Sequence, residues 1–336
     1  MRGTLGRHTT PDLEPPMSHL PDPYGPAVPP APEGGYLPPQ SAFVQPGADP
    51  YHDPLVAPPH GGVGPWFQRI GGLFQRAWRP TLIIIALTQL VPAMVLGVGM
   101  LFAGVYLGMG IVQMDPATGT GELDLAAFFT FFGVLVALVL VLYVVQLAGY
   151  AAATHSVTRQ AAGVPVNLGE SLGYGFRRCL GLFGWYIPVG LMIVVGTLAC
   201  FLPGLYLMAA TALVGPIFLF ERGNPIGRSF KMLHGSGGRV LGRLALIVLI
   251  GFGAGLAVSA VEAVIQLGID SVGSQVYGPT VDGVAVITLG AIVATVLGTV
   301  IQLPVTMFQF AGVLLTYTEQ RGYEGATTLH LNAELR

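Results

Sequence analysis

Five side chains with a carboxyl or amide group lie deep inside long apolar stretches of this 336-residue chain, where such polar groups are rare and usually functional. One is a carboxyl group and four are amides: Glu262, Gln89, Gln146, Gln302 and Gln309. A carboxyl group inside a membrane is a candidate for moving protons. Glu262 lies about 20 residues from the start of its stretch, however, and no partner for a proton relay is visible. We therefore expect it near the far membrane interface, in contact with water and in a structural role.

The four amides admit two interpretations. Gln302 and Gln309 are seven residues apart and share one face of a helix. In lipid an amide must find a partner, so hydrogen bonds between helices are the expected use of all four. The alternative is a polar path for a substrate, because polar groups inside membranes often face interior cavities.

Basic residues at the ends of the apolar stretches form a second candidate site. The set comprises Arg177, Arg178, Arg228, Lys231, Arg239 and Arg243. Positive side chains at such positions fix the orientation of membrane helices and contact anionic phospholipid headgroups, each contributing about 1 kcal/mol. A sharper hypothesis is that two short helices carrying these residues together shape a pocket for a phosphorylated lipid.

Signatures of enzymes and cofactor sites are absent from the sequence. It contains no phosphate-binding glycine loop, nucleophile elbow, metal-ligand cluster or nucleotide fingerprint. His155 and His234 lack a second ligand at metal spacing. We therefore expect no catalytic residues, no cofactor and no metal site, and a protein without enzymatic activity.

Composition and charge predict a membrane protein. Hydrophobic residues make up 52% of the chain and charged residues only 10%, against about a quarter in soluble domains. All 15 Lys and Arg residues fall on one side of a six-span topology, and the net charge of −2 predicts no nucleic-acid partner. The opposite connections carry only acids: Asp115, Glu122, Asp124, Asp270 and Asp282. The positive-inside rule then predicts a multi-pass membrane protein with both termini in the cytoplasm. Fourteen of the fifteen bases are Arg, a bias that suggests a GC-rich bacterial genome and hence a bacterial inner (cell) membrane.

Six apolar stretches approach or exceed the roughly 20 residues that a bilayer core requires. They predict an all-α protein with spans at residues 80–110, 125–154, 180–202, 205–220, 240–267 and 284–317. The fourth stretch is the shortest and follows the third across only Pro203 and Gly204. Because each pair of spans begins and ends on the basic side, the transmembrane domain at 66–320 consists of three helical hairpins.

Short amphipathic helices are expected beside the spans. Residues 66–79 place aromatic and apolar side chains at helical spacing, with three arginines between them. Asn167 with Glu170, and Asn224 with Pro225, are typical starts of two further helices. We expect each of the three helices to lie at the inner membrane surface.

Two polar tails flank the spans. Residues 1–65 hold 17 of the 27 prolines and predict a disordered cytoplasmic tail with polyproline II character. Tyr24, Tyr36 and Tyr51 lie near prolines and would suit a docking segment for a protein partner, although most such segments are simple solvated tails. Residues 321–336 are expected to form a short cytoplasmic tail.

One stretch resembles a known family. In LVGPIFLFERGNPIGRSFKMLHGSGGRVLGRL, an apolar helix ends at a charged residue and glycine, a short helix follows, and an arginine leads the next span. Glu221, Gly223, Ser229, Arg239 and Gly242 match the membrane domain associated with bacterial glycerophosphoryl diester phosphodiesterases. The closing LLTYTEQRGYEGATTLHL also resembles that family's ending.

The resemblance covers roughly residues 67–331 and implies a membrane location and a lipid context. The fused enzymes carry a soluble catalytic barrel, whereas this chain ends soon after its last span, so we expect a stand-alone form without phosphodiesterase activity. Two functions stay open. One is an accessory or scaffolding role among membrane lipids, with partners recruited by the Pro-rich tail, and the other is a transporter or lipid translocator.

Overall fold

The computed structural model describes residues 53–58, 62–97, 99, 112–114, 121–272 and 281–335. The expected disordered tail over residues 1–52 and the remainder of the first predicted span lie outside this range. So do the side chains of Asp115, Glu122, Asp270 and Asp282.

Six helices are long and apolar enough to cross a membrane, which confirms the all-α membrane architecture. They cover Val63–Gly97, Leu125–Ala161, Leu168–Ala199, Phe201–Phe220, Arg239–Ile269 and Ile292–Tyr323. These bounds overlap all six predicted spans. Among the described residues, the β structure is one antiparallel pair, in which β1 (Val112–Met114) meets β2 (Gly121–Leu123) just before the second membrane helix.

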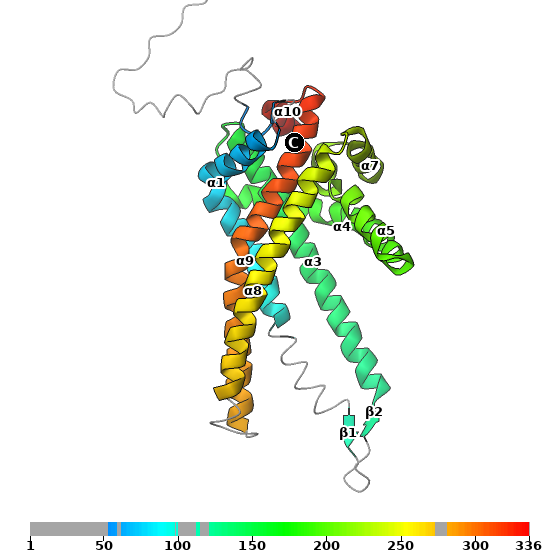
Figure 1. Cartoon of the computed structure of the whole chain (residues 1–336), viewed down its shortest axis with the longest axis vertical. Coiled ribbons are helices and arrows are strands. Elements are labelled where there is room, and N and C mark those ends of the chain that lie inside the picture. Colours follow the sequence, from blue (N-terminus) through cyan, green and yellow to red (C-terminus); the bar gives the residue numbers. More distant parts are fainter. Residues whose placement is uncertain are drawn as a thin grey trace, which may run out of the picture. The chain divides into compact units, whose positions relative to one another are not determined.

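The helices pack as three hairpins. In chain order they are α1 (Val63–Ile85), the π-helical turn η3 (Ala86–Leu90), α3 (Leu125–Ala161), α4 (Leu168–Ala199), α5 (Phe201–Thr211), α6 (Val214–Phe220), α7 (Pro225–Gly235), α8 (Arg239–Val272), α9 (Val281–Tyr323) and α10 (Thr328–Glu334). Extensive contacts join α1 with α3, α4 with α5, and α8 with α9, and equally extensive contacts between α3 and α4 join the first hairpin to the second. Figure 1 shows α8 and α9 running antiparallel along one another.

Two of the three expected surface helices are not separate elements. α1 runs unbroken through Pro80, and α4 runs unbroken from Leu168 to Ala199. Asn167 does cap α4, since its Oδ1 accepts a hydrogen bond from the amide of Gly169 at 2.9 Å, but no turn separates that cap from the span. A single proline removes one helical hydrogen bond and does not by itself impose a turn.

Only α7 stands alone as predicted. Asn224 Oδ1 caps it by accepting from the amides of Ile226 and Gly227 at 3.0 and 3.2 Å. After the helix ends, Gly237 and Gly238 adopt φ of 59° and 84°, a left-handed conformation that glycine reaches without strain. This turn lets α8 begin as a new helix.

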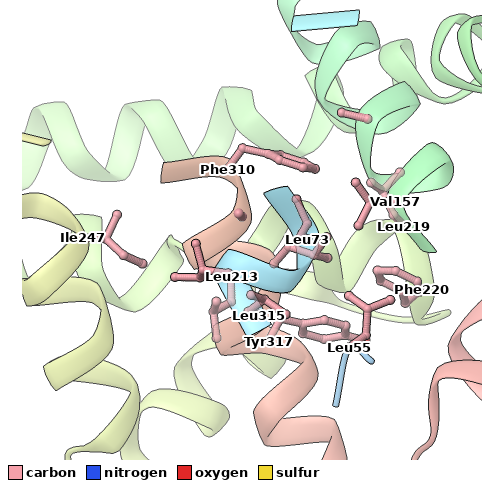
Figure 2. Close-up of a cluster of buried hydrophobic side chains, with 14 of the residues drawn as sticks. Leu55, Leu73, Val157, Leu213, Leu219, Phe220, Ile247, Phe310, Leu315 and Tyr317 are labelled. Carbon is pink, nitrogen blue, oxygen red and sulfur yellow. The ribbon is translucent and has the colours of Figure 1, made fainter. Parts of the chain in front are cut away.

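The predicted end of the N-terminal tail at residue 65 is wrong, because residues 53–58 are packed against the helices. Leu55 is 1% exposed, and Figure 2 shows it among core side chains from several helices. Asp53 Oδ1 accepts from the amides of Leu55 and Val56 at 3.0 and 2.8 Å, and Asp53 Oδ2 accepts from the amide of Thr328 at 3.0 Å. Residues 53–58 are named the N-terminal clip.

The predicted C-terminal tail at 321–336 is also structured. Residues Thr328–Glu334 form α10, which Thr327 caps through its side-chain oxygen. Leu331 and Leu335 are buried, and α10 packs against α3. The sequence analysis missed this helix because the segment TTLHLNAEL is too short and too polar to resemble a membrane span.

The largest hydrophobic core lies mostly at the end of the helices that carries the basic residues. This region, residues 53–79, 154–178, 210–247 and 310–335, is named the charged end. Trp66, Ile70 and Leu73 of α1 are buried in this core, with Trp66 edge-on to Phe308 of α9. Part of the amphipathic face of residues 66–79 is therefore packed against protein, while Phe67 and Trp78 on the same helix are 39% and 46% exposed.

Candidate functional site

A cavity of about 400 Å³ brings together four of the five polar residues predicted inside the membrane. Its lining comes from the first membrane helix, α3, α8 and α9, and includes Gln89, Gln146, Glu262 and Gln302. Three hydroxyl residues, Ser259, Thr299 and Thr306, also line it. We name it the polar cavity.

Helical periodicity places these side chains on common faces. Ser259 and Glu262 are three residues apart on α8, and Thr299, Gln302 and Thr306 follow at intervals of three and four on α9. Residues at such spacing share one side of a helix. The sequence analysis missed the three hydroxyl residues, although their spacing from Gln302 and Glu262 was the signal that could have found them.

Gln89 is placed by an irregularity in the first membrane helix. It belongs to η3, a single π-helical turn, and such turns occur often at functional sites. Within the same turn, Thr88 Oγ1 donates to the carbonyl of Ile84 at 2.7 Å and packs tightly against Gly149 of α3. A Cβ at position 149 would overlap the Thr88 hydroxyl, so glycine permits the close approach of the two helices here.

A second cavity, of about 260 Å³, adjoins the first. It shares Gln89 and Thr306 with the polar cavity, and Gln309 also lines it. Tyr150 and Tyr186 contribute aromatic walls, and the buried Tyr150 hydroxyl makes no hydrogen bond of standard geometry within the described residues. All five predicted polar residues therefore line one or both of two neighbouring cavities.

Glycines make room for two of these polar groups. A Cβ at Gly298 of α9 would overlap the carboxyl group of Glu262, and a Cβ at Gly251 of α8 would overlap the amide of Gln309. Each side chain therefore crosses from its own helix to lie against the backbone of the other. This arrangement fixes where the carboxyl group and the amide can point.

The expected hydrogen bonds between helices are not formed by these side chains. Within the described residues, the side chains of Gln89, Gln146, Glu262, Gln302 and Gln309 have no hydrogen-bond partner, and all five are half-buried. The reason is geometric, since the amides face cavity space instead of one another. Half-buried amides without protein partners are available to water or to a ligand.

Glu262 is not the isolated carboxyl group that the sequence suggested. It lies about 29 Å along α8 from Arg243, with three amides and three hydroxyls in the same cavity. Its predicted contact with water at the far interface stays a prediction.

The six basic residues do not act as one set. Arg243 is buried at the charged end, where its Nε and Nη2 each lie 3.2 Å from the carboxylate of Glu319. Arg228 Nε donates to Glu221 Oε2 at 2.9 Å, and its Nη2 donates to Glu324. Burial alone lowers the pKa of Arg228, but the hydrogen bonds and negative charges of Glu324 and Glu221 outweigh it and raise that pKa above its ordinary value.

The other four bases have different surroundings. Arg239 lies over the ring of Tyr323 at 4.1 Å, a cation–π contact, and Lys231 is exposed on α7. Arg177 and Arg178 line a third cavity with residues of α3 and α10. The cavity at α4 is completed by α10 and not by α7, and the hypothesis of one pocket between the helices that begin after Asn167 and Asn224 stays a prediction.

The sequence analysis also missed the acids that pair with these bases. Glu221, Glu319 and Glu324 all lie on the basic side of the spans, close in sequence to Arg222 or Arg321. An acid among bases at a helix end is a usable signal for an ion pair. It does not say which base the acid will meet, because Arg228 and Glu324 are 96 residues apart.

Within the described residues, no group of three or more His, Cys, Asp or Glu side chains could hold a metal ion. No protein-family model, characterised protein or solved structure matches the chain. The resemblance to the phosphodiesterase-associated membrane domain stays a prediction.

Proposed function

We propose that this chain is a transporter that carries a small cationic solute across a bacterial inner membrane. The observation that supports the proposal is the polar cavity, where Glu262, Gln89, Gln146 and Gln302 converge from four helices without bonding to one another. Polar groups at membrane depth carry a cost that selection tolerates mainly for function.

The chemistry of the lining favours a neutral or positively charged solute. Glu262 supplies a carboxyl group that can neutralise a cation or take up a proton. The amides supply donors and acceptors together, and the hydroxyls add more of both. Among the described residues that line the two cavities there is no Lys or Arg, so an anionic solute would have no counter-charge there.

The two cavities together extend over a useful part of the membrane. From Thr299 to Gln309, polar residues recur along about 15 Å of α9, roughly half of a 30 Å hydrocarbon core. Gln309 lies on the side nearer the charged end, which we assign to the cytoplasm together with both termini. A solute leaving Glu262 would thus meet Gln302, Thr306 and Gln309 in turn.

The test is electrogenic transport by the full chain reconstituted in liposomes on a solid-supported membrane. Concentration jumps of methylammonium, choline and putrescine should give a saturable current for at least one cation. Glu262→Gln should reduce it by about tenfold or more, because a carboxylate contact of about 1.4 kcal/mol or more is lost. Glu324→Gln makes the same chemical change at the charged end and should keep at least about half of the current.

Absence of current with all three cations, or equal currents for wild type and Glu262→Gln, would overturn the proposal. A lower expression level is excluded as a cause by matching the amount of protein in each preparation.

A second candidate, an accessory or scaffolding role in an envelope lipid context, is favoured by the N-terminal clip. The clip fixes the point at which the Pro-rich residues 1–52 join the bundle, through Asp53 and Thr328. Such an attachment would suit an arm that recruits protein partners. Deleting residues 1–52 would remove co-purifying proteins under this function, whereas transport in liposomes would be unchanged.

A further inference from the structure

The third cavity, of about 510 Å³, lies at the charged end between α3, α4 and α10. α3 contributes His155 and Arg159, α4 contributes Tyr174, Arg177 and Arg178, and α10 contributes Asn332. None of the residues that line it also lines either of the two cavities described above. We name it the basic cavity, and its volume falls in the range of small-molecule sites.

The charges of this cavity are not balanced. Arg159 forms an ion pair with Glu170, which also lines the cavity. Arg177 and Arg178 make no ion pair within the described residues, and both are exposed. By contrast, Arg228 and Arg243 at the same end of the helices are paired with carboxylates. The basic cavity thus combines two uncompensated guanidinium groups with a concave surface.

The interior of the cavity is polar and preformed. His155 is buried, its Nδ1 lies 3.1 Å from Ser171 Oγ, and its ring stacks on Tyr174 with centroids 4.6 Å apart. The Tyr174 hydroxyl is buried, and the nearby Arg178 acts on it through its charge and a hydrogen-bonding contact that falls short of standard geometry. The Arg178 guanidinium carbon lies 5.8 Å from the centre of the Tyr174 ring.

We propose that the basic cavity binds a phosphate group, with Arg177 and Arg178 as its direct ligands. Guanidinium groups match phosphate oxygens with paired hydrogen bonds, and an ion pair of this kind is stronger than a neutral contact. The Tyr174 hydroxyl and the Asn332 amide offer further donors at the wall. This inference concerns an anion at the charged end and stands independently of the proposed transport.

The surroundings favour a phospholipid headgroup as the source of the phosphate. Phe176 and Leu180, which flank the two arginines on α4, are 55% and 69% exposed. Further along the same helix, Ile187 and Leu191 are also exposed. A lipid with its phosphate in the basic cavity could therefore lay its acyl chains along α4. A soluble phosphate ester would use the same arginines without these apolar contacts.

Native mass spectrometry of the full chain in a mild detergent tests this site. Phosphatidylglycerol, phosphatidylcholine and glycerol phosphate serve as the probes. Wild type should bind phosphatidylglycerol at least about tenfold more tightly than phosphatidylcholine. The pair Arg177→Gln and Arg178→Gln should weaken that binding by about tenfold or more, since two charged hydrogen-bonding groups are lost.

The matched control is the pair Arg222→Gln and Lys231→Gln, which removes two exposed charges of the same end outside the cavity. It should change the affinity by less than about threefold, as expected for general attraction to a charged headgroup. Equal losses of phosphatidylglycerol affinity in both double variants, or no loss in the Arg177→Gln and Arg178→Gln variant, would overturn the proposed site.

Glycerol phosphate distinguishes the two sources. If it displaces phosphatidylglycerol from wild type at millimolar concentration, the cavity recognises the phosphate itself, and a soluble ester is a sufficient ligand. If glycerol phosphate does not compete, while the binding of phosphatidylglycerol still depends on the two arginines, the ligand is a lipid. Should the double variant unfold, the single variant Arg177→Gln replaces it, because Arg177 is exposed and makes no ion pair in the described part of the chain.

Discussion

Outside the basic cavity, the charged end pairs its buried or half-buried carboxylates with bases or hydroxyls, whereas the polar cavity leaves its polar side chains without protein partners in the described residues. At the charged end, Arg243 meets Glu319, Arg228 meets Glu221, and Asp53 meets Thr328, beside fully buried apolar side chains such as Leu331. In the polar cavity, one carboxyl group and three amides have no partner within the described residues. The first region therefore resembles the interior of a stable soluble protein. The second has the unpaired polar lining that is typical of a binding site.

The difference separates residues that stabilise the fold from residues that serve the proposed transport. Paired charges and close packing hold the helices at one end, so changes there should lower the free energy of unfolding. Unpaired polar groups at membrane depth contribute little to that free energy and are retained for another purpose. The following predictions rank substitutions by their expected effect on stability, and each one tests this division.

The largest effect is expected from breaking the buried ion pair. Arg243→Gln removes the ion-pair partner of the buried Glu319 and leaves, among the described residues, only the charge of Arg69 acting on it, and the side chains of Arg243 and Glu319 are only 8% and 3% exposed. It also removes a hydrogen bond to the carbonyl of Gly62 and the contact with the Trp66 ring at 5.5 Å. We expect a loss of about 3–5 kcal/mol in the free energy of unfolding, measured by denaturant titration in detergent.

Arg222→Gln provides the control for that measurement. Arg222 is exposed in the turn before α7 and forms no ion pair in the described part of the chain, so its loss should cost less than about 0.5 kcal/mol. If the two variants were equally stable, the buried pair would not be what holds the charged end together.

The membrane spans could be predicted from sequence because their signals are local. Hydropathy identified all six, and the one-sided basic residues grouped them into hairpins. The sequence did not predict that α1 and α4 each continue from their amphipathic, Arg-containing segment into the membrane span. An amphipathic segment followed by an apolar one fits either one long helix or two helices joined by a turn. The N-terminal clip was missed because its evidence is a contact between Asp53 and Thr328, 275 residues apart.

The candidate site was predicted in part. A polar side chain in an apolar stretch is conspicuous, so Glu262 and the amides could be found without a structure. Their convergence depends on the rotation of each helix about its axis, on the π-helical turn at Gln89 and on the space left by Gly298. These features follow from packing between helices, which residue type alone does not encode.

An intermediate effect is expected at the N-terminal clip. Asp53→Ala removes the carboxylate that accepts from the amides of Leu55, Val56 and Thr328, leaving buried donors unpaired. We expect a loss of about 2 kcal/mol that is confined to the clip and α10. Hydrogen exchange should show faster exchange at those amides only. Thr328→Val removes the partner hydroxyl and should give a smaller change at the same amides.

A small effect is expected at the partly exposed network of α7. Arg228 is 24% exposed and pairs with Glu221 and Glu324, whose hydrogen bonds and charges raise its pKa despite burial. Arg228→Gln should cost about 0.5–1 kcal/mol in the free energy of unfolding, as partly solvated pairs usually do. The loss should shrink when salt rises from about 0.1 to about 1 M, since screening weakens such pairs. Arg243→Gln, with its buried pair, should show little salt dependence.

The smallest effect on stability, and the sharpest test of the division, is expected in the polar cavity. Glu262→Gln preserves side-chain shape and removes a carboxyl group that has no partner within the described residues, so stability should change by less than about 0.5 kcal/mol or rise. Gly298→Ala would push the Glu262 carboxyl group away from α9, and a flexible side chain can move at little cost. Both variants should unfold like wild type in the denaturant titration that shows the lower stability of Arg243→Gln. The transport current should nevertheless fall strongly in both. A loss of about 3 kcal/mol or more in the free energy of unfolding of either variant, on the order of a broken buried pair, would mean that the cavity side chains hold the helices together. The two regions would then not differ in the way described above.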